Sequence, residues 1–166
     1  KFIRGKREFL TEMELSQYIA LYDANKLTTK LQKVLRHFIF MCSTSVRFGD
    51  LEHMEKDFVI SDFMVFRPQK TEDSRTILKV PLNKLAKRMI VEGEGEKGKI
   101  FKCISNQKTN EYLKLISMML NISKKITCHV ARHTYATLFL KLGGKVEVLS
   151  KILGHSDIET TMIYVH

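Results

Sequence analysis

The stretch TTKLQKVLRHFIFMCST, residues 28–44, carries a broad apolar stripe at helical spacing. Its apolar residues recur three and four positions apart, at Leu31, Val34, Leu35, Phe38, Ile39 and Cys42. Such a stripe avoids water only if other elements cover it, so the stretch predicts a long, buried helix. A helix of this kind favours a domain in which further helices pack around it.

Helix signals continue on both sides of this stretch. The segment TEMELSQYIALYD opens with Thr11 and has Glu14 three positions on, which is the reciprocal pattern of a capping box. Further helices are predicted in the stretches 43–54, 83–92, 110–122, 128–144 and 145–154. Gly154 ends the last of these, as a C-terminal glycine commonly does. The chain is therefore expected to be mainly helical.

A small sheet is predicted between these helices. DFMVFRPQ (62–69) and RTILKVPL (75–82) are rich in β-forming residues and are separated by the turn-like KTEDS (70–74). They are expected to form an antiparallel hairpin, to which KDFVI (56–60) adds a third strand. The expected fold class is thus mainly α with some β (α+β), a helical domain with a small antiparallel β-sheet.

Composition and charge narrow the class of protein. The chain has 166 residues, 44% of them hydrophobic and 28% charged, as is typical of one globular domain. Lys and Arg outnumber Asp and Glu by 28 to 18, which gives a net charge of +10. Such an excess on a small domain favours a polyanionic partner, with nucleic acid the obvious candidate. A soluble protein that happens to be basic is the open alternative.

The sequence also indicates a compartment. No apolar run approaches the ~20 residues of a membrane span, and the basic start KFIRGKREFL has no apolar signal region behind it. Cys42, Cys103 and Cys128 are widely spaced and form no C-x-x-C pair, which is not the pattern of a disulfide framework or a zinc ribbon. We expect reduced thiols and a cytoplasmic protein.

The last stretch, LGHSDIETTMIYVH (153–166), places a tyrosine close to the end of the chain. Ser156 and Glu159 have the spacing of a second capping box and predict a final α-helix. On that helix Ile158, Met162 and Val165 share one face, and Tyr164 lies roughly 120° away from its centre. Tyr164 is therefore expected off the apolar stripe, which favours a functional tyrosine without removing the alternative of a packed aromatic.

The stretch HVARHTYAT places further chemistry on the helix predicted over 128–144. His129 and Arg132 lie three positions apart, opposite the apolar stripe, so they are expected to share one surface. A plain solvated helix face is the alternative. His129 and His133 are four apart, as metal ligands on a helix can be, but Val130 stands where a zinc protease has its general-base Glu. No metal and no other cofactor is predicted.

Taken in order, these motifs resemble the catalytic domain of the tyrosine recombinases, the integrase family of phages and conjugative transposons. The resemblance rests on Arg47 in TSVRFGDL, Lys70 at the hairpin, the HVARHTYAT block, and LGHSDIETTMIY, in which Tyr164 follows His155 by nine positions. It covers nearly the whole chain and implies the fold of DNA breaking-rejoining enzymes.

The resemblance implies a metal-independent cleavage of DNA with Tyr164 as the nucleophile. Attack on a phosphodiester loads negative charge onto the phosphate oxygens, which fixed cations and hydrogen-bond donors must meet. Arg47 and Arg132 are expected to supply the cations, because a guanidinium is always charged and presents a planar donor fork. By the same resemblance, His155 donates a further hydrogen bond to the phosphate.

Three further residues receive roles from the resemblance. His129 is the usual candidate for the general base that deprotonates Tyr164. Lys70 is expected to protonate the departing 5′ oxygen, and Asp50 to brace a buried cation by a charged hydrogen bond. Several other basic residues are expected to contact the DNA backbone or to be solvated surface: Arg36, Lys84, Lys87, Lys124 and Lys125.

The expected function is therefore a site-specific recombinase that cuts and rejoins double-stranded DNA through a covalent 3′-phosphotyrosine. Residues 1–166 are expected to be an isolated catalytic domain, without the N-terminal core-binding domain and the segment after the nucleophile that family members ordinarily carry. The full-length protein is expected to self-associate into a tetrameric synapse. It is expected to bind no small-molecule cofactor and no membrane. A type IB topoisomerase and a DNA-binding module without chemistry are the alternatives.

Overall fold

The computed structural model describes residues 7–70, 75–92 and 98–165 of the chain. Helix α2 (Thr29–Thr44) runs through its centre and is buried without interruption from Val34 onwards. Thr28 caps it by accepting a hydrogen bond from the backbone N–H of Leu31. The prediction of a long, buried central helix is confirmed.

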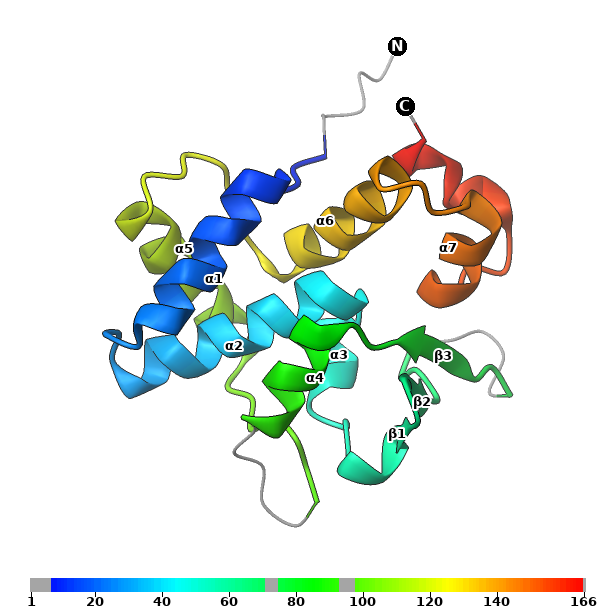
Figure 1. Cartoon of the computed structure of the whole chain (residues 1–166), viewed down its shortest axis with the longest axis horizontal. Coiled ribbons are helices and arrows are strands. Elements are labelled where there is room, and N and C mark those ends of the chain that lie inside the picture. The colour runs from blue at the N-terminus through cyan, green and yellow to red at the C-terminus, as the bar shows by residue number, and fades with distance from the viewer. Residues whose placement is uncertain (1–6, 71–74, 93–97, 166) are drawn as a thin grey trace.

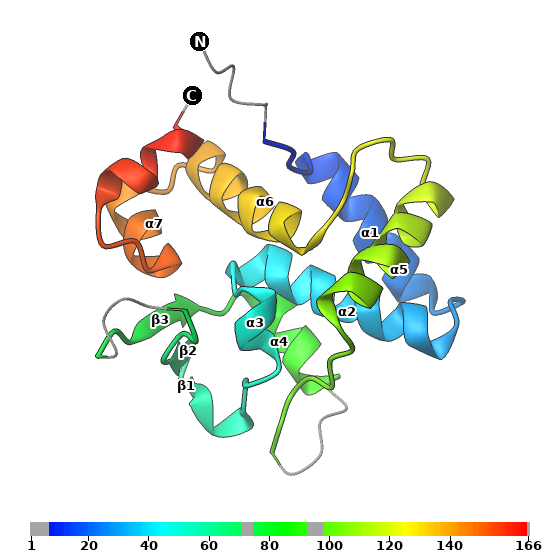
Figure 2. The same cartoon turned by 180° about the vertical axis from the view of Figure 1, so that it is seen from behind.

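Other helices surround α2 (Figures 1 and 2). They are α1 (Glu12–Ala24), α4 (Lys84–Val91), α5 (Asn106–Met119) and α6 (Cys128–Lys141), and each packs directly against α2. The capping box of α1 is present as predicted, with Thr11 and Glu14 bonded to each other's backbone N–H groups. Helix α5 begins four residues earlier than predicted, because Ser105 caps its N-terminus.

The sheet lies to one side of the helices, next to α7 (Val146–Leu153). Its order is β1 (Val59–Ile60), β2 (Phe63–Phe66) and β3 (Leu78–Pro81), all antiparallel. The short helices α3 (Phe48–Leu51) and η1 (Lys56–Phe58) precede it. The predicted hairpin and third strand are confirmed, while residues 71–74 between β2 and β3, and the Gly-rich 93–97, lie outside the described residues.

The last segment departs from the predicted α-helix. It forms two turns of 3₁₀-helix, η2 (Ile158–Thr160) and η3 (Met162–Tyr164). Asp157, not Ser156, caps the first turn by accepting a hydrogen bond from the backbone N–H of Glu159 at 3.0 Å. The predicted capping box and the α-helix that depends on it are therefore wrong.

This change of helix type also reverses the predicted faces. In a 3₁₀-helix, residues three apart lie on the same side, and Thr161 and Tyr164 form the buried side here. Tyr164 is 7% exposed, whereas Met162 and Val165 are 42% and 45% exposed. The prediction that Tyr164 lies off the packed face is wrong, since it was drawn on an α-helical wheel.

Arg36 also differs from its expectation as a surface or DNA-backbone residue. It is 2% exposed, and its guanidinium donates to the carbonyl oxygens of Met89 at 2.7 Å and Ile100 at 3.2 Å. It also stacks on the ring of Phe101. Arg36 therefore ties α2 to the end of α4 and to the segment before α5.

None of the helices in the described parts of the chain has the length and apolar character needed to span a bilayer.

Candidate active site

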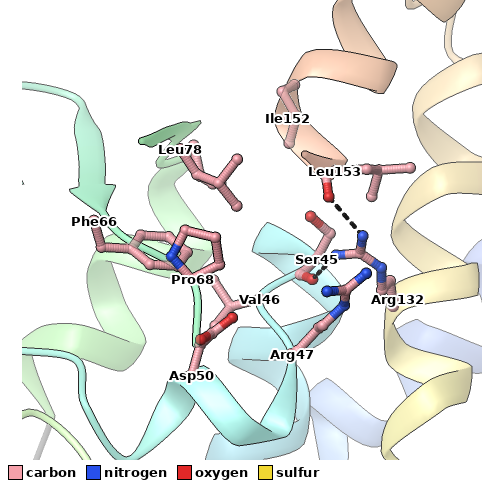
Figure 3. Close-up of a pocket in the computed structure, with 11 residues that line it drawn as sticks. Ser45, Val46, Arg47, Asp50, Phe66, Pro68, Leu78, Arg132, Ile152 and Leu153 are labelled. Carbon is pink, nitrogen blue, oxygen red and sulfur yellow. Dashed lines mark hydrogen bonds between the residues drawn. The ribbon is translucent and has the colours of Figure 1, made fainter. Parts of the chain in front are cut away.

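Arg47 and Arg132 meet at one pocket although they lie far apart in the sequence. Arg47 stands at the N-terminus of α3, directly after α2, and Arg132 projects from α6. Both line a small pocket at the junction of α2, α6 and α7 (Figure 3). The structure thus brings together the two predicted phosphate-binding arginines.

The side chain of Arg132 is held rigidly. Its Nη1 donates to the carbonyl oxygen of Ser45 at 3.0 Å, and its Nη2 donates to that of Leu153 at 2.7 Å (Figure 3). Burial, followed by the positive charge of Arg47, lowers the pKa of Arg132 to about 10. The guanidinium therefore keeps its charge at neutral pH and has a fixed orientation.

Asp50 lines the same pocket as the two arginines. It is buried, and its carboxylate accepts a hydrogen bond from the backbone N–H of Gln69 at 2.7 Å. Its negative charge raises the pKa of Arg132, opposing the effect of burial. Asp50 therefore favours the charged guanidinium, while its hydrogen bond to Gln69 holds the start of the β2–β3 connection.

A surface cleft of about 880 Å³ lies beside this pocket, between β3 and α7. Arg47, Lys70 and His155 all line it. Lys70 is exposed and follows β2, whereas His155 directly follows Gly154 at the end of α7. Three of the predicted site residues therefore face one cavity open to solvent.

The ring of His155 is fixed by the segment that follows it. Its Nδ1 lies 2.7 Å from Oγ1 of Thr161, which is fully buried. Burial, and then the charges of Arg132 and Arg47, lower the pKa of His155 to about 4. The imidazole is therefore neutral at pH 7, and Thr161 leaves its Nε2 available to a ligand.

Tyr164 is not among the residues that line the cleft, and its ring lies in a small apolar cluster. Ala136 of α6 and Leu149 and Leu153 of α7 form this cluster. Burial raises the pKa of Tyr164, while the positive charges of Arg132, Arg7 and Arg47 lower it. The phenol is therefore packed away from solvent and within the electrostatic field of three arginines.

The hydroxyl of Tyr164 lies 2.7 Å from Nδ1 of His133 on α6. His129, the residue expected from the resemblance to act as base, is exposed one turn earlier on the same helix. Sequence reasoning considered His133 only as a metal ligand. A signal was available, because His133 precedes the buried Ala136 and Thr137 by three and four positions and so faces the packed side of the helix.

Comparisons with known proteins identify relatives of this chain. A model of the phage integrase family matches residues 8–166. The integrase of Escherichia phage P2 is 28% identical over 99% of this chain and 47% of its own length. The tyrosine recombinase XerA of Saccharolobus solfataricus is 31% identical over 83% of this chain and 46% of its own length.

The fold itself also has solved counterparts. A structure of the Tn1549 transposon integrase in complex with circular intermediate DNA matches with a TM-score of 0.77, at 16% identity. The match covers 99% of this chain and 64% of that one. The chain spans about half the length of the curated relatives it matches.

Proposed function

Because the chain belongs to the phage integrase family, we propose that it is the catalytic domain of a tyrosine recombinase that cuts and rejoins DNA through a covalent 3′-phosphotyrosine. The observation that carries this proposal is that a phenol lies within the electrostatic reach of two guanidinium groups that share one pocket. Tyr164 lies in the field of Arg132 and Arg47, beside the cleft that Lys70 and His155 line.

The cleft has the features needed to hold a phosphodiester. As the tyrosine attacks, negative charge grows on the non-bridging oxygens, and preorganised donors lower the energy of that state. Arg132 is oriented in advance by Ser45 and Leu153, and Arg47 stands next to it. His155, with Nδ1 engaged by Thr161, directs its Nε2 as a further donor.

The proposed reaction conserves the energy of the phosphodiester bond. The oxygen of Tyr164 forms a bond to phosphorus, the bond from phosphorus to the 5′ oxygen breaks, and the strand becomes linked to the enzyme by a 3′-phosphotyrosine. Lys70, exposed at the mouth of the cleft, supplies a proton to the departing 5′ oxygen. Religation is the reverse, so the reaction consumes no nucleotide.

Access to the nucleophile requires a local movement. Tyr164 is only 7% exposed, so a phosphate reaches its oxygen after η3 shifts toward the cleft. Only short 3₁₀ turns hold this segment, and such turns are less stable than a continuous α-helix. The nucleophile is thus carried on one of the more easily rearranged elements of the domain.

The proposed partner is double-stranded DNA, in keeping with the net charge of +10. The Tn1549 integrase of similar fold was solved with DNA, and the curated relatives are about twice as long as this chain. We therefore propose that the whole protein carries a further DNA-binding domain, assembles into a tetrameric synapse on its site, and acts in the cytoplasm.

The test is covalent capture. The protein is incubated in EDTA with nicked duplexes from a random-sequence pool. Cleavage next to the nick releases a short strand that diffuses away, so religation is prevented and the covalent intermediate is trapped. We expect an adduct that survives denaturant and maps to Tyr164 by mass spectrometry. Tyr164→Phe should bind DNA normally and form no adduct, while Tyr112→Phe on α5 should behave as wild type. An adduct with Tyr164→Phe, or an absolute need for divalent metal, would refute the proposal.

A further inference from the structure

We infer that His133 is a catalytic residue of this reaction, the group that accepts the proton of Tyr164 as the tyrosine attacks. The inference rests on the proposed function and assigns to His133 the role that the resemblance gives to His129. It starts from one contact, the 2.7 Å between Nδ1 of His133 and the hydroxyl oxygen of Tyr164.

The contact is well defined on both sides. The two rings lie 5.6 Å apart between centroids and are tilted by 46°. His133 stands in the middle of α6, one residue from the anchored Arg132, and the ring of Tyr164 packs on Ala136 three residues further along that helix. Because α6 carries both His133 and a packing contact of the tyrosine, the hydroxyl and Nδ1 are paired before η3 shifts, and the inference requires that the pair persists through this shift.

The surroundings of His133 keep its ring neutral and able to accept a proton. Burial, and then the charges of Arg7, His129 and Arg132, lower its pKa to about 4. The inference requires the neutral tautomer in which Nδ1 accepts the O–H of Tyr164 and Nε2 carries the proton of the ring. In that tautomer, donor and acceptor are correctly matched before the substrate arrives.

Substrate binding strengthens this base. A phosphate held between Arg47 and Arg132 brings negative charge next to Arg132, one of the cations that depress the pKa of His133. Offsetting that cation favours the protonated imidazole, so the pKa of His133 rises toward its ordinary value. The base thus becomes effective when the phosphate occupies the site.

The proton balance is complete with His133 in this role. The proton of Tyr164 passes to Nδ1 of His133, the oxygen–phosphorus bond forms, and the 5′ oxygen leaves with a proton from Lys70. In religation the imidazolium returns its proton to the tyrosine oxygen. His129 is exposed, and in the described residues no hydrogen bond joins it to Tyr164.

The decisive variant is His133→Asn, because the amide oxygen can replace Nδ1 as hydrogen-bond acceptor but cannot take up a proton. Single-turnover adduct formation with the nicked duplexes should slow ~10²–10⁴-fold, the usual contribution of a general base. The adduct that forms should still map to Tyr164. His53→Asn, on an exposed histidine before β1, is the matched control and should react as wild type.

The pH profile separates a base from a merely structural residue. Without a base the reaction depends on pre-ionised tyrosine, so the logarithm of the rate for His133→Asn should rise with pH between 6 and 9 with a slope near ~1. Wild type should level off above pH ~7, where the ring of His133 is neutral. A residue that only positions Tyr164 would lower the rate and leave the shape of the wild-type profile unchanged.

A second variant guards against misfolding. His133→Ala opens a space beside the tyrosine, and added imidazole should restore part of its rate without changing its melting temperature. If His133→Asn kept the rate and pH profile of wild type, the inference would be overturned and the proposed function would stay intact. The same would follow if His129→Asn lost the rate and the His133→Asn variant reacted as wild type. Failure of wild type to form any adduct would instead refute the proposed function.

Discussion

At the scale of the residue, Arg132 combines a structural and a chemical task. Its guanidinium already donates hydrogen bonds to the carbonyl oxygens of Ser45 and Leu153. Arg132→Lys keeps the charge but cannot span both carbonyls, so one is left without its donor and the free energy of unfolding should fall by about 1–3 kcal/mol. Cleavage should fall much further, because the ammonium also loses the planar contact to phosphate.

Urea denaturation and single-turnover cleavage, measured on the same preparation, check this prediction. Arg88→Lys is the control, because the guanidinium of Arg88 makes exposed ion pairs with Asp23 and Glu92 and lies over the ring of Tyr22, away from the pocket. If Arg132→Lys is as stable and as fast as the control variant, Arg132 neither joins the two segments nor clamps a phosphate.

The sequence identified site residues that belong to a motif more readily than residues whose role depends on their tertiary contacts. Arg47, Arg132, Lys70 and His155 were named from motifs, and the structure gathers them around one pocket and cleft. The buried bonds of Arg36 and the contact of His133 with Tyr164 were missed. Both depend on segments 31 or more positions away, which no local pattern encodes.

At the scale of the element, the junction of α7 with the sheet depends on Gly154. This residue ends α7 at φ +75°, and a Cβ on it would lie 2.8 Å from Cδ2 of Leu78 on β3. Gly154→Ala should therefore be destabilised by the left-handed backbone, roughly 1–2 kcal/mol, and further by the clash. It should also displace His155 from the cleft.

Gly143→Ala is the matched control, because Gly143 also has a positive φ, +95°, but has no atom within 4 Å of its added Cβ. Thermal unfolding of the two variants should show the larger loss for Gly154→Ala. Equal losses would mean that contact with Leu78 does not limit the approach of α7 to the sheet.

Elements with strong local signals were predicted well, whereas the final segment, residues 155–165, was not. Capping residues, glycine ends and apolar periodicity located α1, α2, α6, α7 and the hairpin. In residues 155–165 the apolar positions fit an α-helix by spacing, but the segment is too short to be helical without packing. Packing of Thr161 and Tyr164 selected 3₁₀ turns instead.

At the scale of the whole molecule, charge should govern DNA binding. With a net charge of +10, neutralisation of phosphates and release of counterions should dominate the affinity. Binding of this domain to duplex DNA should weaken steeply with salt and depend little on sequence. A titration of affinity against salt concentration checks this, and a flat log–log slope or a sharp preference for one duplex would contradict it.

Buried histidines should make the stability of the fold sensitive to acid. Burial is the main cause that lowers the pKa of His37 to about 3 and those of His133 and His155 to about 4. An unfolded histidine titrates near ~6.5, so below that pH the unfolded chain binds protons that the folded chain refuses. The stability is complete above ~6.5 and is lost as pH falls toward 4, by up to about 1.4 kcal/mol per pH unit for the buried His37. The loss is smaller for the half-buried His133 and His155, whose charges water screens.

Urea denaturation between pH 7 and pH 4.5 measures this loss. His37→Gln removes the most deeply buried of the three groups, and its unfolding free energy should change less with pH than that of wild type. His53→Gln, on an exposed histidine, should follow wild type. An unfolding free energy of wild type that is constant over this range would contradict the assignment of neutral buried rings.

The two hydrogen bonds from Arg132 to backbone carbonyl oxygens also bear on how the domain folds. They close stretches of 87 and 21 residues, so the guanidinium gains its partners only after the ends of α2 and α7 have both arrived at α6. Contacts between distant segments form slowly, because chain entropy must be lost before they are made. During refolding, helix content should therefore recover before the phosphate pocket exists, and the ability to cut DNA should return only with the slowest kinetic phase.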